Sequence, residues 1–160
     1  MNLKESPAAY ADIQGNKNYP NLKGKVYFYD TYGGTMAAVT VRGITDGNGK
    51  NSQNFHGFHI HAGKECTGNG EEPFMNVDGH YNPENTEHPQ HAGDLPPLLS
   101  NNGVAWMSVY TDRFYPEDII GKTVIIHAMA DDFHTQPSGN SGEMIACGEI
   151  KEWDEKIRNA

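Results

Sequence analysis

The sequence has no long apolar run and few basic residues. None of its apolar segments approaches the roughly 20 residues that a membrane-spanning helix needs. Twelve Lys and Arg stand against 21 Asp and Glu, which gives a formal net charge of −9. An acidic chain of this kind is a poor partner for nucleic acid or for an anionic membrane surface, and it disfavours anionic substrates in general. We therefore expect neither nucleic acid nor a membrane among its partners.

The sequence also shows no internal repeat, no internal boundary and no leader-like pattern at its start. Residues 1–15 have neither the basic start nor the apolar core of a signal peptide. We therefore expect a cytoplasmic protein, or an extracytoplasmic one if a leader was removed and replaced by Met1. A chain of 160 residues with no boundary in its composition predicts a single domain that spans 1–160.

Long stretches of helical periodicity are absent as well, whereas Gly (18) and Pro (9) are plentiful. This composition favours short strands joined by turns. The expected strands are 24–30, 35–43, 55–62, 103–111, 123–130 and 143–150. We expect loops at 63–102 and 131–142, a short helical turn or connection at 114–122, and a solvated tail or frayed helical turn at the end. The sequence thus predicts an all-β, Greek-key flattened barrel or sandwich of about eight antiparallel strands with two long functional loops.

Three of the eight histidines lie in the segment HGFHIHAG, residues 56–63. Because side chains alternate along a strand, His59 and His61 face the same way with Cα atoms about 7 Å apart. Phe58 and Ile60 then face the core. Two imidazoles at this separation can reach one metal ion, but the pair alone is equally compatible with two surface histidines.

Further metal-binding side chains follow along the chain. His80, His88, His91 and Asp94 are separated by seven, two and two residues, and His127 lies inside an expected strand. Three imidazoles and one carboxylate suit tetrahedral zinc, and an imidazole-rich set with an open position suits copper. Metal ligation would also hold a long loop that has no core of its own. The histidines therefore predict a metal site.

Five motifs in order, GFHIH, GHYNP, HAGDLP, IIHAMADD and GNSGEMIACG, resemble those of the copper–zinc superoxide dismutase family, of bacterial type with shortened zinc and electrostatic loops. The resemblance covers residues 55–150 and, loosely, the first hairpin. It implies disproportionation of superoxide with copper and zinc as cofactors, with superoxide as the small-molecule partner and with a homodimer as one assembly.

Carried over position by position, the resemblance implies a role for each metal-binding side chain. The implied copper ligands are His59, His61, His80 and His127. The implied zinc ligands are His80, His88, His91 and Asp94, so that His80 bridges the two metals. His80 and His127 are the implied catalytic residues, and Asp131 matches an aspartate that hydrogen-bonds one copper ligand and one zinc ligand. His56 is expected to be structural, and His134 to lie on the surface.

The two cysteines, Cys66 and Cys147, are by themselves compatible with two separate buried thiols. The resemblance implies instead a disulfide that pins the long loop to the barrel.

Two departures from the family pattern affect the expected activity. Met144 occupies the position where the family has an arginine that attracts the anion, and His88 and His91 are closer together in sequence than is usual. We therefore expect slow dismutation. Two alternatives stay open: a non-catalytic copper/zinc-binding protein that buffers or stores metal, and an acidic interaction domain whose histidines are incidental.

Overall fold

The computed structural model describes residues 6–44 and 54–154, and within these ranges the regular secondary structure is almost all β-strand, joined by long loops. The strands are β1 (Ala9–Gly15), β2 (Lys23–Thr31), β3 (Gly34–Arg42), β4 (Phe55–His61), β5 (Asp94–Asn101), β6 (Val104–Thr111), β7 (Thr123–His127), β8 (Met144–Glu149) and β9 (Lys151–Glu152). The helices are the single-turn 3₁₀ helix η1 (Met75–Val77) and the short α1 (Pro116–Ile119). Neither helix of the described ranges is long and apolar enough to cross a membrane.

The strands form one antiparallel sheet that closes into a barrel. Their order is β2-β3-β6-β5-β4-β7-β8-β1-β9, and β1 also pairs with β2 along its length. The predicted all-β barrel class is therefore confirmed, with β9 as a two-residue extension beside β1. Strand β9 corrects the expectation of a tail at its two residues, because their backbone pairs with β1.

Besides β9, two strands were not predicted from the sequence. Strand β1 was missed because its Ala, Asp and Gln residues have weak strand preference, although its burial is set by contact with β2 and β8. Strand β5 corrects the predicted loop 63–102 at its last residues. Its Pro96–Pro97 pair breaks the alternating pattern, and the pairing with β4 and β6 maintains the strand.

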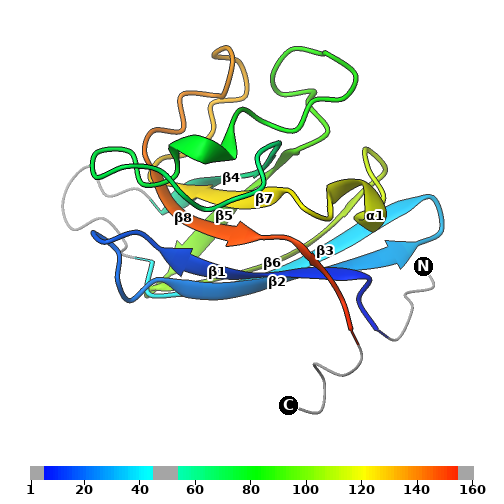
Figure 1. The fold of residues 1–160 in the computed structure, drawn as a ribbon, viewed down its shortest axis with the longest axis horizontal. Helices are drawn as coiled ribbons and strands as arrows, with labels where there is room; N and C mark the ends of the chain where they lie inside the picture. The colour runs from blue at the N-terminus through cyan, green and yellow to red at the C-terminus, as the bar shows by residue number, and fades with distance from the viewer. Residues whose placement is uncertain (1–5, 45–53, 155–160) are drawn as a thin grey trace.

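The barrel interior is apolar and fixes which way the site residues point. Phe58 and Ile60 of β4 are fully buried in the main core together with Val124 and Ile126 of β7. Side chains alternate along β4, so His59 and His61 lie on the opposite side of the strand. The loops 62–93 and 128–143 rise together over this side (Figure 1). They bury both histidines, with 0% of His59 and 5% of His61 exposed.

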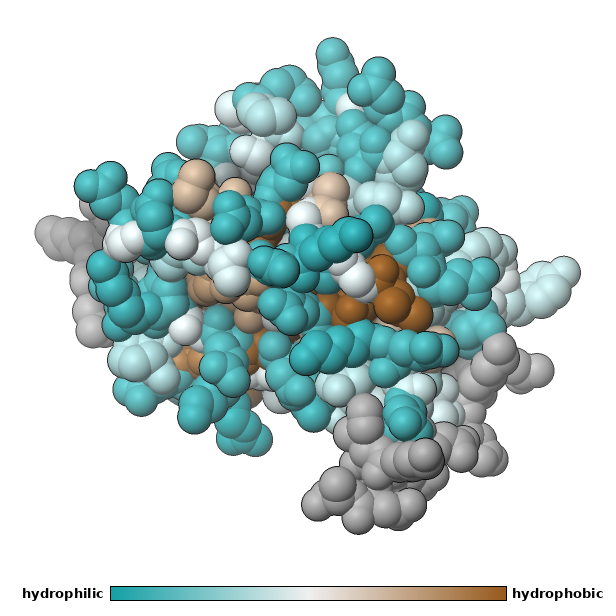
Figure 2. All heavy atoms as spheres, viewed as in Figure 1, coloured by the Kyte–Doolittle hydropathy of each residue, from teal (hydrophilic) through white to brown (hydrophobic). Residues whose placement is uncertain are grey.

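The face of the molecule seen in Figure 2 is mainly hydrophilic. Figure 2 shows polar side chains over most of the viewed face, with apolar side chains visible only in separate small areas.

Candidate metal centre

A disulfide holds the long loop against the barrel. Cys66 of the loop is bonded to Cys147 of β8, so the prediction of a disulfide is confirmed. Beside it, Phe74 and Val77 of the loop pack on Ile125 in a second small apolar cluster. The loop therefore has an anchor and a core of its own before any metal is considered.

Four histidines meet where β4, β7 and the long loop come together. His59 and His61 come from β4 and His127 from the end of β7, while His80 is brought to β4 by an isolated bridge to His61. One ring nitrogen of each lies within 4.8 Å of the others. We call these four residues the inner group.

Each ring of the inner group has one buried nitrogen without a hydrogen-bond partner among the described residues: Nδ1 of His59 and Nε2 of His61, His80 and His127. The other nitrogens are occupied. Nδ1 of His61 donates to the Asp78 carbonyl at 2.7 Å, and Nδ1 of His127 donates to the Gly142 carbonyl at 3.2 Å. Because a nitrogen that donates carries the proton, the nitrogen left over carries a lone pair. Buried lone pairs that converge without a donor fit a metal cation.

A second group shares one ring with the first. Its members are His80, His88, His91 and Asp94, whose ligand atoms lie within 4.8 Å of one another. Asp94 has its Oδ1 2.7 Å from His80 Nδ1 and its Oδ2 3.0 Å from His88 Nδ1 and 3.3 Å from His91 Nδ1. The contact with His88 is close but lacks hydrogen-bond geometry. Three imidazoles and one carboxylate thus form the outer group.

His80 therefore faces both groups, with Nδ1 in the outer group and Nε2 in the inner one. The short spacing of His88 and His91 does not prevent them from meeting. A turn between them, with Gln90 N–H donating to the Glu87 carbonyl at 2.8 Å, brings their ring centroids to 5.6 Å.

Asp131 connects the two groups, because it accepts a hydrogen bond from one histidine ring of each. Its Oδ2 accepts from His59 Nε2 at 2.7 Å and its Oδ1 accepts from His88 Nε2 at 2.8 Å. Oδ1 also accepts from the Phe133 N–H at 2.7 Å. Only 4% of Asp131 is exposed. One carboxylate thus orients one ring of each group.

The electrostatics favour the metal-binding forms of these side chains. Burial lowers the pKa of His59, sets that of His61 well below its usual value and lowers that of His127 to about 3. Burial by itself would raise the pKa of Asp131, but hydrogen bonds from His59, the Phe133 N–H and His88 outweigh it, and the pKa lies below its usual range. Neutral imidazoles and charged carboxylates are the states in which these groups bind metals.

Comparisons with known proteins agree with this geometry. The sequence profile described as copper/zinc superoxide dismutase (SODC) matches residues 22–150. The chain belongs to the copper/zinc superoxide dismutase family. A superoxide dismutase [Cu-Zn] of Legionella pneumophila is 35% identical, over 82% of this chain and 80% of that protein. One from Deinococcus radiodurans is 32% identical, over 89% of this chain and 83% of that protein.

A solved structure supports the same relationship. The Cu/Zn superoxide dismutase from Brucella abortus superposes with a TM-score of 0.73 at 26% identity, covering 89% of this chain and 99% of that one. The donor chemistry fits the two metals of the family. Four imidazole nitrogens suit copper, and three imidazoles with a carboxylate suit zinc.

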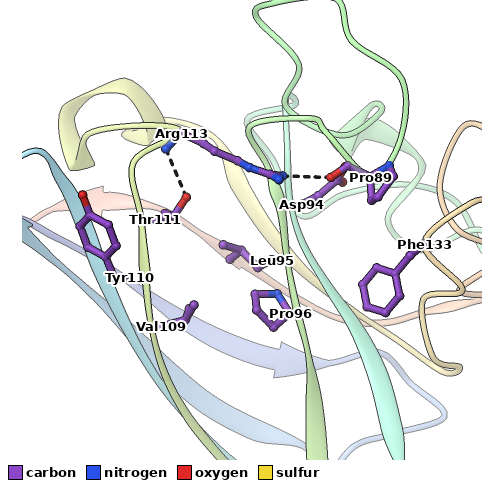
Figure 3. A pocket seen from close by; sticks show the side chains of 9 residues that line it. All are labelled: Pro89, Asp94, Leu95, Pro96, Val109, Tyr110, Thr111, Arg113 and Phe133. Atoms are coloured by element: carbon purple, nitrogen blue, oxygen red, sulfur yellow. Dashed lines mark hydrogen bonds between the residues drawn. The ribbon is translucent and has the colours of Figure 1, made fainter.

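Two residues that support the outer group were missed in the sequence. Gln136 accepts from the His88 N–H at 2.9 Å and donates to the His88 carbonyl at 2.6 Å. Arg113 donates to the Pro89 carbonyl at 2.9 Å and the His91 carbonyl at 3.1 Å, and Figure 3 shows its side chain reaching across to Pro89. Their partners are backbone groups, which every residue has, so the sequence contains no signal for these bonds.

The two remaining histidines lie where the sequence predicts. His56 is buried, with Nδ1 donating to the His127 carbonyl at 3.1 Å, and it belongs to neither group. His134 has 79% of its side chain exposed.

A cavity of about 450 Å³ opens onto the inner group. Its lining includes His61, His80, His127, Asp78 and Met144, and among the described residues no Lys or Arg lines it. Met144, at the position of the family's arginine, therefore brings a thioether to a cavity wall that lacks a positive side chain.

Proposed function

We propose that this chain disproportionates superoxide into oxygen and hydrogen peroxide, with copper held by the inner group and zinc by the outer group. The observation that carries the proposal is the convergence of four buried, unpartnered imidazole nitrogens from the described residues, one of them on a ring whose other nitrogen faces the outer group. Bound copper would supply reversible one-electron chemistry, which oxidises one superoxide and reduces a second with two protons, whereas zinc has no accessible redox change.

The protein's own part begins with His80. Its Nδ1 lies 2.7 Å from Asp94 Oδ1 on the side of the outer group, and Nε2 points into the inner group. Nε2 can present a lone pair or carry a proton. A proton held there lies beside the cavity lined by His80 and His127 and is positioned for transfer to the reduced substrate. We therefore assign His80 the proton-donating role and place His127 at the wall that substrate meets.

Asp131, Asp78 and Gly142 hold the other rings. The Asp131 carboxylate fixes His59 through Nε2, while the carbonyls of Asp78 and Gly142 fix His61 and His127 through Nδ1. Ligand rings held in one tautomer do not need to reorganise during turnover.

Met144 makes the proposed activity slow. The loss of one charged contact near a partly desolvated site costs roughly 1.5–3 kcal/mol in anion affinity or barrier. We expect Met144→Arg to raise kcat/KM and to make it fall with added salt, because the new charge acts mainly on association. Met36→Arg, on β3, introduces the same charge at another half-buried methionine and should leave kcat/KM unchanged. An unchanged kcat/KM in Met144→Arg would contradict this account.

The test of the function itself combines metal analysis with a dismutation assay. Purified protein loaded with copper and zinc should contain one of each per chain and should disproportionate superoxide. The acidic chain and the thioether at Met144 favour one alternative, a copper/zinc-binding protein that buffers or stores metal. Full metal content without dismutation would support that alternative. We also propose a homodimer, which light scattering in solution would test.

A further inference from the structure

Met144 lies next to the inner group. As the first residue of β8, it is the cross-strand partner of His127 in β7. The register of this pairing shifts between Ile126 and His127, so the pair lies at an irregularity of the ladder. The Nε2 of His127 has no hydrogen-bond partner in the described ranges, and both side chains line the same cavity. The thioether therefore stands at the rim of the space that the unpartnered nitrogens face.

A second cavity, of about 440 Å³, adjoins the first. Gly142 and Met144 line both cavities, so the thioether lies between them. The other lining residues of the second cavity include Met75 and the exposed carboxylates of Glu71, Glu72 and Glu143. Met75 is 48% exposed, and its sulfur accepts only a weak bond from Asn69 Nδ2 at 3.1 Å.

The charged side chains around this second cavity are mainly negative, so they attract cations. No Lys or Arg of the described ranges lines either cavity. Lys17 is nearby, and its Nζ donates to the Gly70 carbonyl at 2.9 Å. Glu143 accepts from the Asn16 amide at 3.1 Å, which leaves its charge in place. Three carboxylates against one lysine raise the local concentration of cations and repel an anion such as superoxide.

The two sulfurs narrow the choice of cation. Thioethers are soft, uncharged ligands that select Cu(I), whereas carboxylates alone would attract any cation. We propose that Met144, together with Met75 in the lining of the same second cavity, captures Cu(I) there and passes it to His61 and His127. The inference rests on the proposed copper centre. The inner group already has four nitrogen donors, so the thioether acts during loading and is not a ligand of the finished centre.

The first test follows copper loading in zinc-loaded, copper-free protein with its disulfide intact. The probe is the acetonitrile complex of Cu(I), added without oxygen at limiting concentration, and the finished centre is read after oxidation by its visible absorption. Met144→Leu keeps the side-chain volume and removes the sulfur. We expect it to slow copper capture by about tenfold, in the range seen when groups around a metal site are lost. Met36→Leu, a half-buried methionine of β3, is the matched control and should load at the wild-type rate.

The second test isolates the sulfur site. In His61→Ala/His127→Ala protein, X-ray absorption after addition of one equivalent of Cu(I) should show copper–sulfur scattering. The same scattering should be lost when Met144→Leu is added.

These tests separate the inference from the proposed function. If Met144→Leu loads at the wild-type rate, or if no sulfur scattering is found, the capture site is wrong. Slow loading together with a lower copper content at saturation would also count against it, because it would indicate damage to the histidine centre. If the wild-type protein never forms that centre, the proposed function fails by itself, and the sulfur scattering alone then decides whether the capture site exists.

Discussion

Replacing Asp131 with Asn should weaken copper binding more than zinc binding. Asp131 accepts three hydrogen bonds: two at Oδ1, from His88 Nε2 and the Phe133 N–H, and one at Oδ2, from His59 Nε2. An Asn side chain has one accepting oxygen and one donating NH₂. The Asn oxygen can replace either Oδ1, which accepts two hydrogen bonds, or Oδ2, which accepts one. The amide keeps more hydrogen bonds when its oxygen faces His88 and Phe133. Its NH₂ then faces the Nε2–H of His59, and two donors meet.

The magnitude follows from the bond that is lost. A buried hydrogen bond to a charged group contributes about 1.5–3 kcal/mol, and each 1.4 kcal/mol corresponds to a tenfold change in affinity. Without its acceptor, His59 favours the tautomer with the proton on Nδ1, the nitrogen that faces the inner group. We therefore expect copper affinity to fall by about 10- to 100-fold. Zinc affinity should fall by no more than about tenfold, because His88 keeps a neutral acceptor.

The assay is a competition titration of copper and zinc against chelators of known affinity. Asp132→Asn makes the same chemical change one residue away. The Asp132 side chain caps the turn through His134 and Thr135. The Asp132→Asn variant should therefore bind copper and zinc with wild-type affinity, within the error of the titration. Thermal unfolding of the metal-free proteins measures any loss of fold stability separately.

Three results would refute this reasoning. Copper affinity of Asp131→Asn could equal that of the wild type, or zinc affinity could fall more than copper affinity. The same losses of affinity in Asp132→Asn would show that removing any carboxylate from this loop weakens metal binding, whatever its hydrogen bonds.

The remaining predictions concern the supports of the two groups. Replacing both Cys66 and Cys147 with Ser should lower the unfolding free energy by about 4–5 kcal/mol, because the bridge closes a separation of 81 residues, as chemical denaturation would measure. Gly139→Ala should weaken zinc binding in a chelator titration, since its φ is +71° and an added Cβ would collide with the Asp131 carboxylate that connects the two groups. Wild-type zinc affinity in that variant would show that the loop accommodates the added Cβ without displacing the carboxylate. Arg113→Ala should cost about 1–3 kcal/mol in denaturant unfolding of the zinc-bound protein through two lost bonds to loop carbonyls, and an unchanged value would mean that the loop holds without them.

Much of the ligand inventory was predictable because it depends on residue type and on local periodicity. Strand β4 alternates, so His59 and His61 share a side opposite Phe58 and Ile60 whatever the rest of the chain does. The family resemblance, carried by the order and spacing of the motifs, extended this local argument to His80, His88, His91, Asp94 and His127, whose side chains the structure brings into two groups. The pairing of the two cysteines followed only from the family resemblance.

The sequence by itself thus determined the all-β class and the kinds of donor atom available, and the family resemblance added the missing positive charge at Met144. The resemblance had already implied that His80 serves both groups. Only the tertiary structure decided which nitrogen of each ring is left free, and that Gln136 and Arg113 hold the loop through its backbone. The physical reason is that which nitrogen of an imidazole ring stays free depends on the hydrogen-bond partner of its other nitrogen. Those partners are carbonyls and carboxylates from distant segments, such as Asp78, Gly142 and Asp131, which become neighbours only when the barrel closes and its two loops pack together.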